Sequence, residues 1–309
     1  MAGFRIIGSL FLGLLLSLPS EGADHQAKRT TSGQAHHAKG KSAHGTVSGH
    51  GAPAGHRHEH FRSRGRKSGR HHRVVPHHAA THDQGPVREQ TLEEIFPPGH
   101  QFTVEERAEA SAIGAYLQNG LWKDAYKAST KASRQHPDRW WLHAARAAAA
   151  ANLSRSKDTI DAVDQALQTN RGDANRLNLS ELYVLKGNAL SRLNRKGEAI
   201  NTFLAGARVN PKDPYSRAGA AWLYATAEDQ QVRNGAKALG IASEAAKLTG
   251  QKDATVLDVL AASYAETGNF AAARRWEEKA IRAGDPADLP FYQRRLQNYQ
   301  ANLPWRERL

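Results

Sequence analysis

The sequence predicts an all-α protein, an α-solenoid of about five antiparallel helix pairs that follows a signal peptide and a disordered, histidine-rich basic segment. From residue 103 onward the chain is rich in Ala, Leu, Lys, Arg and Glu and lacks the alternation of apolar and polar residues that strands show. Gly120, Asn194 and Gly268 follow one another at equal intervals along the chain, which indicates an internal repeat. Residues 24 to 90, by contrast, hold a single aromatic residue, Phe61, and cannot build a hydrophobic core.

Residues 1–23 have the pattern of an export signal. Arg5 precedes an apolar run of 13 residues, from 6 to 18, and small residues follow it, so we expect cleavage after Gly22 or Ala23. An apolar helix of that length reaches about 20 Å at about 1.5 Å per residue, which is short of a bilayer core of about 30 Å. No later segment is apolar enough to span a membrane. The sequence therefore predicts a mature protein without a transmembrane segment that is periplasmic or secreted.

Residues 24–96 form a low-complexity segment that we expect to be disordered. Fourteen of the 16 histidines lie between His25 and His100, and residues 24 to 90 carry 12 basic and four acidic side chains. Three interpretations remain open for this segment: a solvated tether, a contact with an acidic polymer, or metal capture by His56, His58 and His60. We do not expect nucleic acid as a partner, because an exported chain leaves most of it behind and Phe61 alone could stack on a base.

Several function classes are excluded or disfavoured by composition. The chain has no cysteine, which excludes disulfides, thiolate zinc sites and cysteine nucleophiles. No nucleophile elbow, zinc-binding helix motif or paired-carboxylate signature appears either. The sequence therefore predicts a protein that is not an enzyme and needs no cofactor.

Residues 97–309 are expected to form the helical repeat domain. Thr103 and Glu106 have the spacing of a capping box that begins the first helix. The Gly120, Asn194 and Gly268 series predicts three equivalent tight turns, because Gly and Asn tolerate the left-handed backbone conformation that ends a helix. Alanines that repeat the same interval are expected where two helices approach closely; they are Ala125, Ala199 and Ala273, and also Ala162 and Ala236. The repeat interval of 74 residues divides into one helix pair of about 34 residues and one of about 40 residues. We expect the additional residues of the longer pair to form longer connections at residues 152 to 156 and 229 to 234.

Residues 180 to 213 resemble the repeat unit of the tetratricopeptide repeat family, which is about 34 residues long. At positions 4, 8, 11, 20, 24 and 32 of that unit stand Tyr183, Gly187, Leu190, Ala199, Phe203 and Pro211. A last unit begins at Ala254, and its matches at positions 4, 7, 8, 11, 20 and 27 are Leu257, Leu260, Ala261, Tyr264, Ala273 and Ala280. Glu277 departs from the pattern at position 24. The stretch from Ala221 to Gly250, with Trp222-Leu223-Tyr224-Ala225-Thr226 and then Arg233-Asn234-Gly235, also resembles an exported bacterial subgroup with an enlarged penultimate repeat. The resemblance to the repeat family covers about two thirds of the chain.

The resemblance implies a scaffold that binds a protein or peptide in the concave groove of the stacked repeats. Positions 2, 5, 9 and 12 line that groove in the family, and here they are Glu181, Val184, Asn188 and Ser191, then Thr255, Asp258, Ala262 and Ala265. Asn188 is the leading candidate, because a side-chain amide can bond both the N–H and the C=O of an extended ligand. Trp222 either lines the same groove or packs in the core.

Two functions are compatible with these features. The first is a non-enzymatic interaction scaffold of the bacterial cell envelope. The alternative is a metal-binding or metal-buffering protein that acts through the histidine-rich segment, with the repeats as a docking module. Lys123, Lys127 and Lys131 follow one another at four-residue spacing and form a basic helix face, which is an alternative place for a partner to bind.

Overall fold

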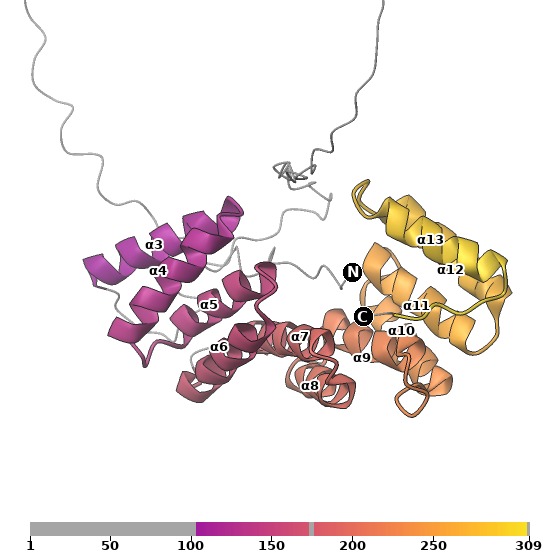
Figure 1. Cartoon of the computed structure of the whole chain (residues 1–309), viewed down its shortest axis with the longest axis horizontal. Coiled ribbons are helices and arrows are strands. Elements are labelled where there is room, and N and C mark those ends of the chain that lie inside the picture. The colour runs from indigo at the N-terminus through magenta and orange to yellow at the C-terminus, as the bar shows by residue number, and fades with distance from the viewer. Residues whose placement is uncertain (1–102, 173–175, 308–309) are drawn as a thin grey trace, which may run out of the picture. The chain divides into compact units, whose positions relative to one another are not determined.

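The computed structural model describes residues 103–172 and 176–307, which form the eleven helices labelled α3 to α13 in Figure 1. The predicted signal peptide (1–23), the predicted disordered segment (24–96) and the candidate metal ligands His56, His58 and His60 lie outside the described residues. None of the described helices combines the length and the apolar character that crossing a bilayer requires. The helices are α3 (Val104–Gln118), α4 (Trp122–Gln135), α5 (Trp140–Asn152), α6 (Ser156–Thr169), α7 (Arg176–Arg192), α8 (Lys196–Val209), α9 (Pro214–Thr226), α10 (Gly235–Leu248), α11 (Ala254–Glu266), α12 (Phe270–Ala283) and α13 (Leu289–Gln300).

The described helices pack in chain order as antiparallel neighbours, which confirms the all-α prediction. Five pairs can be counted, from α3 with α4 to α11 with α12, and α13 packs against α12. The first helices of successive pairs also contact one another, α5 with α7, α7 with α9, and α9 with α11. Within the described ranges, β structure is limited to an isolated bridge between Ala227 and Glu307. The arrangement is that of stacked helix pairs, each of which buries the apolar face of its neighbour.

The first helix begins where the sequence predicted. The Thr103 hydroxyl accepts a hydrogen bond from the Glu106 N–H at 3.1 Å, and the Glu106 carboxylate accepts one from the Thr103 N–H at 2.9 Å. These two bonds satisfy amide groups that the first turn of a helix leaves without a partner inside the helix.

The three predicted turns have the predicted backbone conformation. The φ angles of Gly120, Asn194 and Gly268 are 68°, 60° and 81°, and each residue lies in a short connection between the two helices of a pair. Ser154 has the same conformation, with φ 58°, in an equally short connection. The prediction of a longer connection at residues 152 to 156 is therefore wrong. The longer connection lies after that pair instead, between Thr169 and Arg176.

The second longer connection is where the sequence predicted it, between Thr226 and Gly235. Its length changes the register of α10, so that Ala236 is exposed and the prediction that it lies at a helix contact is wrong. Ala238 occupies that contact and is fully buried. It stands at the same distance from the N-cap of its helix as do the predicted contact residues Ala125, Ala199 and Ala273 of the other pairs, and these three are fully buried as well.

Candidate functional site

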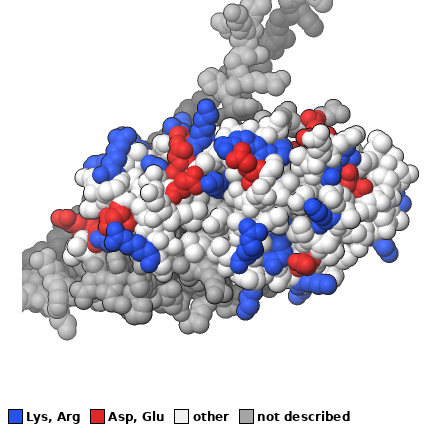
Figure 2. Space-filling model, turned by 90° about the horizontal axis from the view of Figure 1, so that it is seen from below, with Lys and Arg blue, Asp and Glu red and all other residues white. Residues whose placement is uncertain are grey.

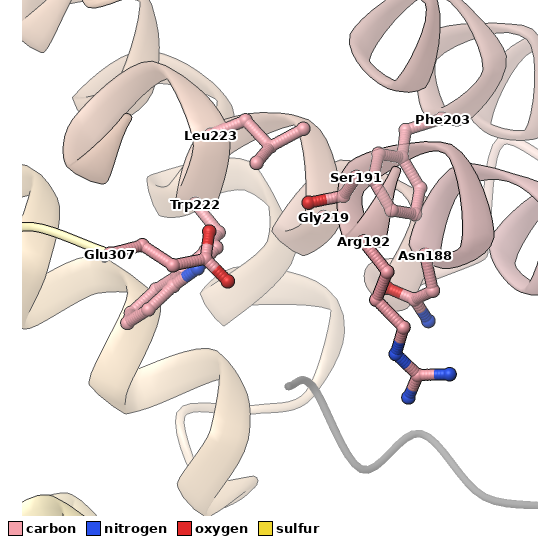
Figure 3. Close-up of a pocket in the computed structure, with 8 residues that line it drawn as sticks. All are labelled: Asn188, Ser191, Arg192, Phe203, Gly219, Trp222, Leu223 and Glu307. Carbon is pink, nitrogen blue, oxygen red and sulfur yellow. The ribbon is translucent and has the colours of Figure 1, made fainter. Parts of the chain in front are cut away.

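A hollow between α7, α9 and the chain's last described residues is the candidate site (Figure 3). Its cavity volume is about 30 Å³, and the hollow opens to solvent. The close-up shows Glu307 and Trp222 on one side, with Ser191, Arg192 and Asn188 on the other. The full lining consists of Asn188, Ser191, Arg192, Phe203, Gly219, Trp222, Leu223 and Glu307. Polar and aromatic side chains therefore converge on one hollow.

A buried ring fixes the distance between the two helices that form the hollow. Phe203, on α8, is 1% exposed. A Cβ atom added at Gly187 would lie 2.6 Å from Cε1 of this ring, and one added at Gly219 would lie 2.5 Å from the same atom. Only glycine therefore allows α7 and α9 to approach the ring from their two sides. This packing brings Asn188, next to Gly187, and Trp222, one turn after Gly219, to the same hollow.

Asn188 and Trp222 occupy the same place in successive repeats, one repeat length apart. Asn188 is half-buried, and Trp222 is largely buried although its side chain reaches the hollow. Trp222 therefore packs in the core, and part of its side chain also lines the hollow. The Arg295 guanidinium lies over the Trp222 ring, 4.9 Å from its centroid, which holds the indole in a fixed position.

The tail, residues 303–307, returns from α13 across α11 to α9 (Figure 1). The Glu307 N–H donates a hydrogen bond to the Thr226 carbonyl at 3.0 Å. Nη1 of Arg306 lies 2.6 Å from Oε2 of Glu266, on α11. The Lys196 ammonium, on α8, donates to the Glu307 carboxylate at 3.3 Å and to the Ser191 hydroxyl at 3.0 Å. An extended segment of the chain itself thus contacts α11, the end of α9 and the start of α8.

The enlarged connection between α9 and α10 supports the same region. Arg233 donates from Nη1 to the Ala227 carbonyl at 2.7 Å, and its Nε lies 3.2 Å from Oε1 of Glu266. Glu266 therefore pairs with Arg233 through one oxygen and with Arg306 of the tail through the other. This connection consequently fixes the carboxylate that the tail contacts.

The structure brings together some of the predicted groove residues and buries others. Asn188, Ser191 and Trp222 line one hollow. Val184 is 3% and Asp258 4% exposed, so neither presents a free surface. In the last pair, Ala262 and Ala265 are buried too, because α13 and the tail cover this side of α11. The expectation that positions 5, 9 and 12 line an open groove is therefore wrong for four residues, Val184, Asp258, Ala262 and Ala265.

Glu181 is also turned away from solvent. Both of its carboxylate oxygens are buried, and within the described ranges neither accepts a hydrogen bond. Burial, together with the nearby Asp213 carboxylate, raises the pKa of Glu181 to about 8. This side chain is neutral over much of the ordinary pH range, and the structure gives it no place in the hollow.

A buried ionic cluster stands where the earlier repeat has apolar contacts. Asp258 and Glu277 occupy the places that Val184 and Phe203 have two helix pairs earlier. Glu277 is fully buried, and Nε of Arg295, on α13, lies 3.4 Å from Oδ1 of Asp258. Burial raises the pKa of both carboxyl groups, and their mutual repulsion raises the pKa of Glu277 further, whereas Arg295 opposes the rise at Asp258. A protonated Glu277 beside an ionised Asp258 is the arrangement that these effects favour.

Charge is mixed over the face of the described helices that Figure 2 shows, where Lys and Arg alternate with Asp and Glu. Lys123, Lys127 and Lys131 are exposed on α4, as the sequence predicted. No three His, Asp or Glu side chains among residues 103–172 and 176–307 converge as metal ligands would. The exposed lysines of α4 are thus the alternative binding face that the sequence predicted.

Comparisons with known proteins find a likeness among solved structures. A scan against protein-family models finds no match, and a search of curated proteins finds none. Among solved structures, the chain is similar to YrrB, a TPR protein with an unusual peptide-binding site, at 16% sequence identity and a TM-score of 0.43. That likeness covers 59% of this chain and 88% of YrrB.

Proposed function

We propose that this protein is a non-enzymatic scaffold that binds an extended protein or peptide segment in the hollow between α7 and α9. The observation that carries the proposal is the convergence of Asn188, Ser191 and Trp222 on one hollow. Positions 9 and 12 of one repeat and position 9 of the next are the places from which the resemblance to tetratricopeptide repeats implies contact with a ligand. Stacked helix pairs place these positions side by side.

The residues of the hollow suit a peptide backbone better than a small polar substrate. The Asn188 amide offers two donors and an acceptor, so that it can bond both the N–H and the C=O of an extended segment. Trp222, although largely buried, contributes apolar surface to the hollow. Arg192 is held by a hydrogen bond from its Nη1 to the Ala151 carbonyl at 3.2 Å, and it adds a positive charge to the lining.

We place this scaffold in the bacterial cell envelope, in the periplasm or outside the cell. The support for this location is the apolar run at residues 6 to 18 with small residues after it, which is typical of an export signal. The basic segment that follows it would then contact acidic polymers of the envelope. N-terminal analysis of the exported protein tests the location, and a retained Met1 would contradict it.

The binding site can be tested without a known partner. Random peptides displayed on phage are selected against the full chain, and the affinity of each selected peptide is measured by fluorescence anisotropy. Asn188→Ala should weaken binding about 5- to 30-fold, which corresponds to one or two lost hydrogen bonds of about 1 to 2 kcal/mol in total. Asn201→Ala, on the exposed side of α8, is the matched control and should leave the affinity unchanged.

A control on the basic face separates the two candidate surfaces. Lys123, Lys127 and Lys131 are replaced together by Gln. Unchanged affinity in Asn188→Ala combined with lost affinity in the Gln variant would move the site to α4. Neither single asparagine substitution should change the free energy of unfolding by more than about 0.5 kcal/mol. Unfolding followed by circular dichroism measures this change.

A further inference from the structure

The tail contacts the repeats as a bound peptide does. Its backbone forms a parallel β bridge between Glu307 and Ala227, at the end of α9. Recognition of an extended segment through main-chain hydrogen bonds, with side-chain pockets for specificity, is a recurrent mode of peptide binding. Leu303, where the tail leaves α13, is 57% exposed, so the tail is joined to the last helix by an open connection.

Three side chains of the tail meet three separate surfaces. The Trp305 ring lies 5.5 Å from the Arg295 guanidinium and packs against the cores of both C-terminal repeats. Arg306 pairs with Glu266. Glu307 reaches Lys196, which is itself only 8% exposed.

These surfaces differ in what they require from a ligand. Glu266 already has Arg233 as a partner, so a basic ligand residue at the position of Arg306 adds little to the affinity. Lys196 has no other carboxylate partner among the described residues, since its other bond goes to the Ser191 hydroxyl, and Arg192 adds positive charge to the hollow beyond it. A largely buried ammonium is costly without a counter-charge. An aromatic residue followed two residues later by an acidic one is therefore the pattern that this surface selects.

We propose that the surface covered by the tail binds an extended partner segment, which has an aromatic residue and an acidic residue two positions later. The tail occupies this surface until such a segment displaces it. The proposal rests on the proposed function and specifies its ligand. Because the tail is covalently attached, its effective concentration is on the order of mM. Only a segment that binds more tightly than the tail, or is present in excess, replaces it.

The test uses the full chain with a protease recognition sequence inserted between Asn302 and Leu303, so that the protein folds with its tail and is cut afterwards. The probe is a labelled peptide of residues 301–307, acetylated and amidated. The cut chain should bind the probe at least 10-fold more tightly than the uncut chain. A tail that never exchanges after cutting, or loss of the helical circular dichroism signal on cutting and dilution, would overturn the proposal, because either result makes the tail a permanent part of the core.

Side-chain variants test the specificity. In the probe, Trp305→Ala should weaken binding about 30-fold, as loss of an aromatic anchor does, and Glu307→Gln about 5-fold or more. In the protein, Lys196→Met should weaken binding as Glu307→Gln does, whereas Arg195→Met should not, because Arg195 is exposed and pairs with Glu198. Equal effects of Lys196→Met and Arg195→Met would contradict the assignment of the acidic position.

The outcome separates this inference from the proposed function. If the probe fails to bind the cut chain, the tail is rejected as a ligand. The proposed function is not affected by that result, because it is tested by the effect of Asn188→Ala on the selected peptides. Probe binding together with selected peptides that are insensitive to Asn188→Ala rejects the proposed function instead.

Discussion

Replacing Arg295 by Met should destabilise the protein strongly, because this side chain is the cation of the buried cluster in the last repeat. Arg295 is 5% exposed and Asp258 is 4% exposed, with 3.4 Å between Nε and Oδ1. Breaking a buried pair by removing one partner typically costs about 3 to 5 kcal/mol, because the other charge is left in an apolar setting. The contact with the Trp222 ring is lost as well. We therefore expect the free energy of unfolding to fall by about 3 kcal/mol or more near pH 7.5.

The same substitution predicts a dependence on pH. Without Arg295, the pKa of Asp258 rises further above that of the unfolded chain, so the folded state binds more protons than the unfolded state. Stability then falls as pH rises through this interval, by up to about 1.4 kcal/mol per pH unit for one proton. The loss caused by Arg295→Met should consequently be smaller at pH 5 than at pH 7.5.

The assay is urea unfolding followed by circular dichroism and tryptophan fluorescence at both pH values. Arg294→Met is the matched control, since Arg294 precedes Arg295 on α13 and is exposed. A loss in Arg295→Met that equals the loss in Arg294→Met, or that is the same at both pH values, would refute the reasoning.

Two further predictions concern the helices on either side of the hollow. Gly219→Ala should lower the free energy of unfolding by about 1 to 3 kcal/mol, because its Cβ would lie 2.5 Å from the buried Phe203 ring, whereas Gly240→Ala, with nothing within 4 Å of its Cβ, should raise it by about 0.5 to 1 kcal/mol. Thermal unfolding measures both, and a loss of equal size at the two positions would contradict the packing argument. Because burial raises the pKa of Glu181 to about 8, the wild type should lose stability as pH rises from about 4.5 to 8, and Glu181→Gln should flatten that slope; parallel slopes in the two proteins would show that Glu181 is not a buried acid.

The helical pairs could be predicted because their signals are local. A left-handed turn favours Gly or Asn at a fixed place, and the series from Gly120 to Gly268 meets that need at equal intervals. Ser154 escaped the prediction, because serine seldom adopts this conformation and therefore gives no signal of it. The register error at Ala236 has another cause. The repeat interval is measured along the chain, and the longer connection before α10 moves the contact on that helix from Ala236 to Ala238.

The hollow could be predicted only in part, because its walls come from distant segments. Asn188 and Ser191 follow from their positions in the clearest repeat. Glu307 could not be found that way, because no sequence pattern near it indicates that the tail folds back and contacts Lys196, which lies far earlier in the chain. Asp258 has a position that suggests a groove, yet Arg295 from a later helix covers it. The sequence did carry one signal of this. Glu277 stands where the repeat pattern has an apolar residue, which indicates that a later segment packs against this repeat.

The most direct test of the central claim is to map where a bound segment lies. A phage-selected peptide with a photoreactive group is crosslinked to the full chain, and the modified residues are identified by mass spectrometry. Our account predicts crosslinks to residues 188 to 192 on α7 and 219 to 223 on α9, together with release of the tail. Crosslinks confined to α4, around Lys123, Lys127 and Lys131, would contradict it.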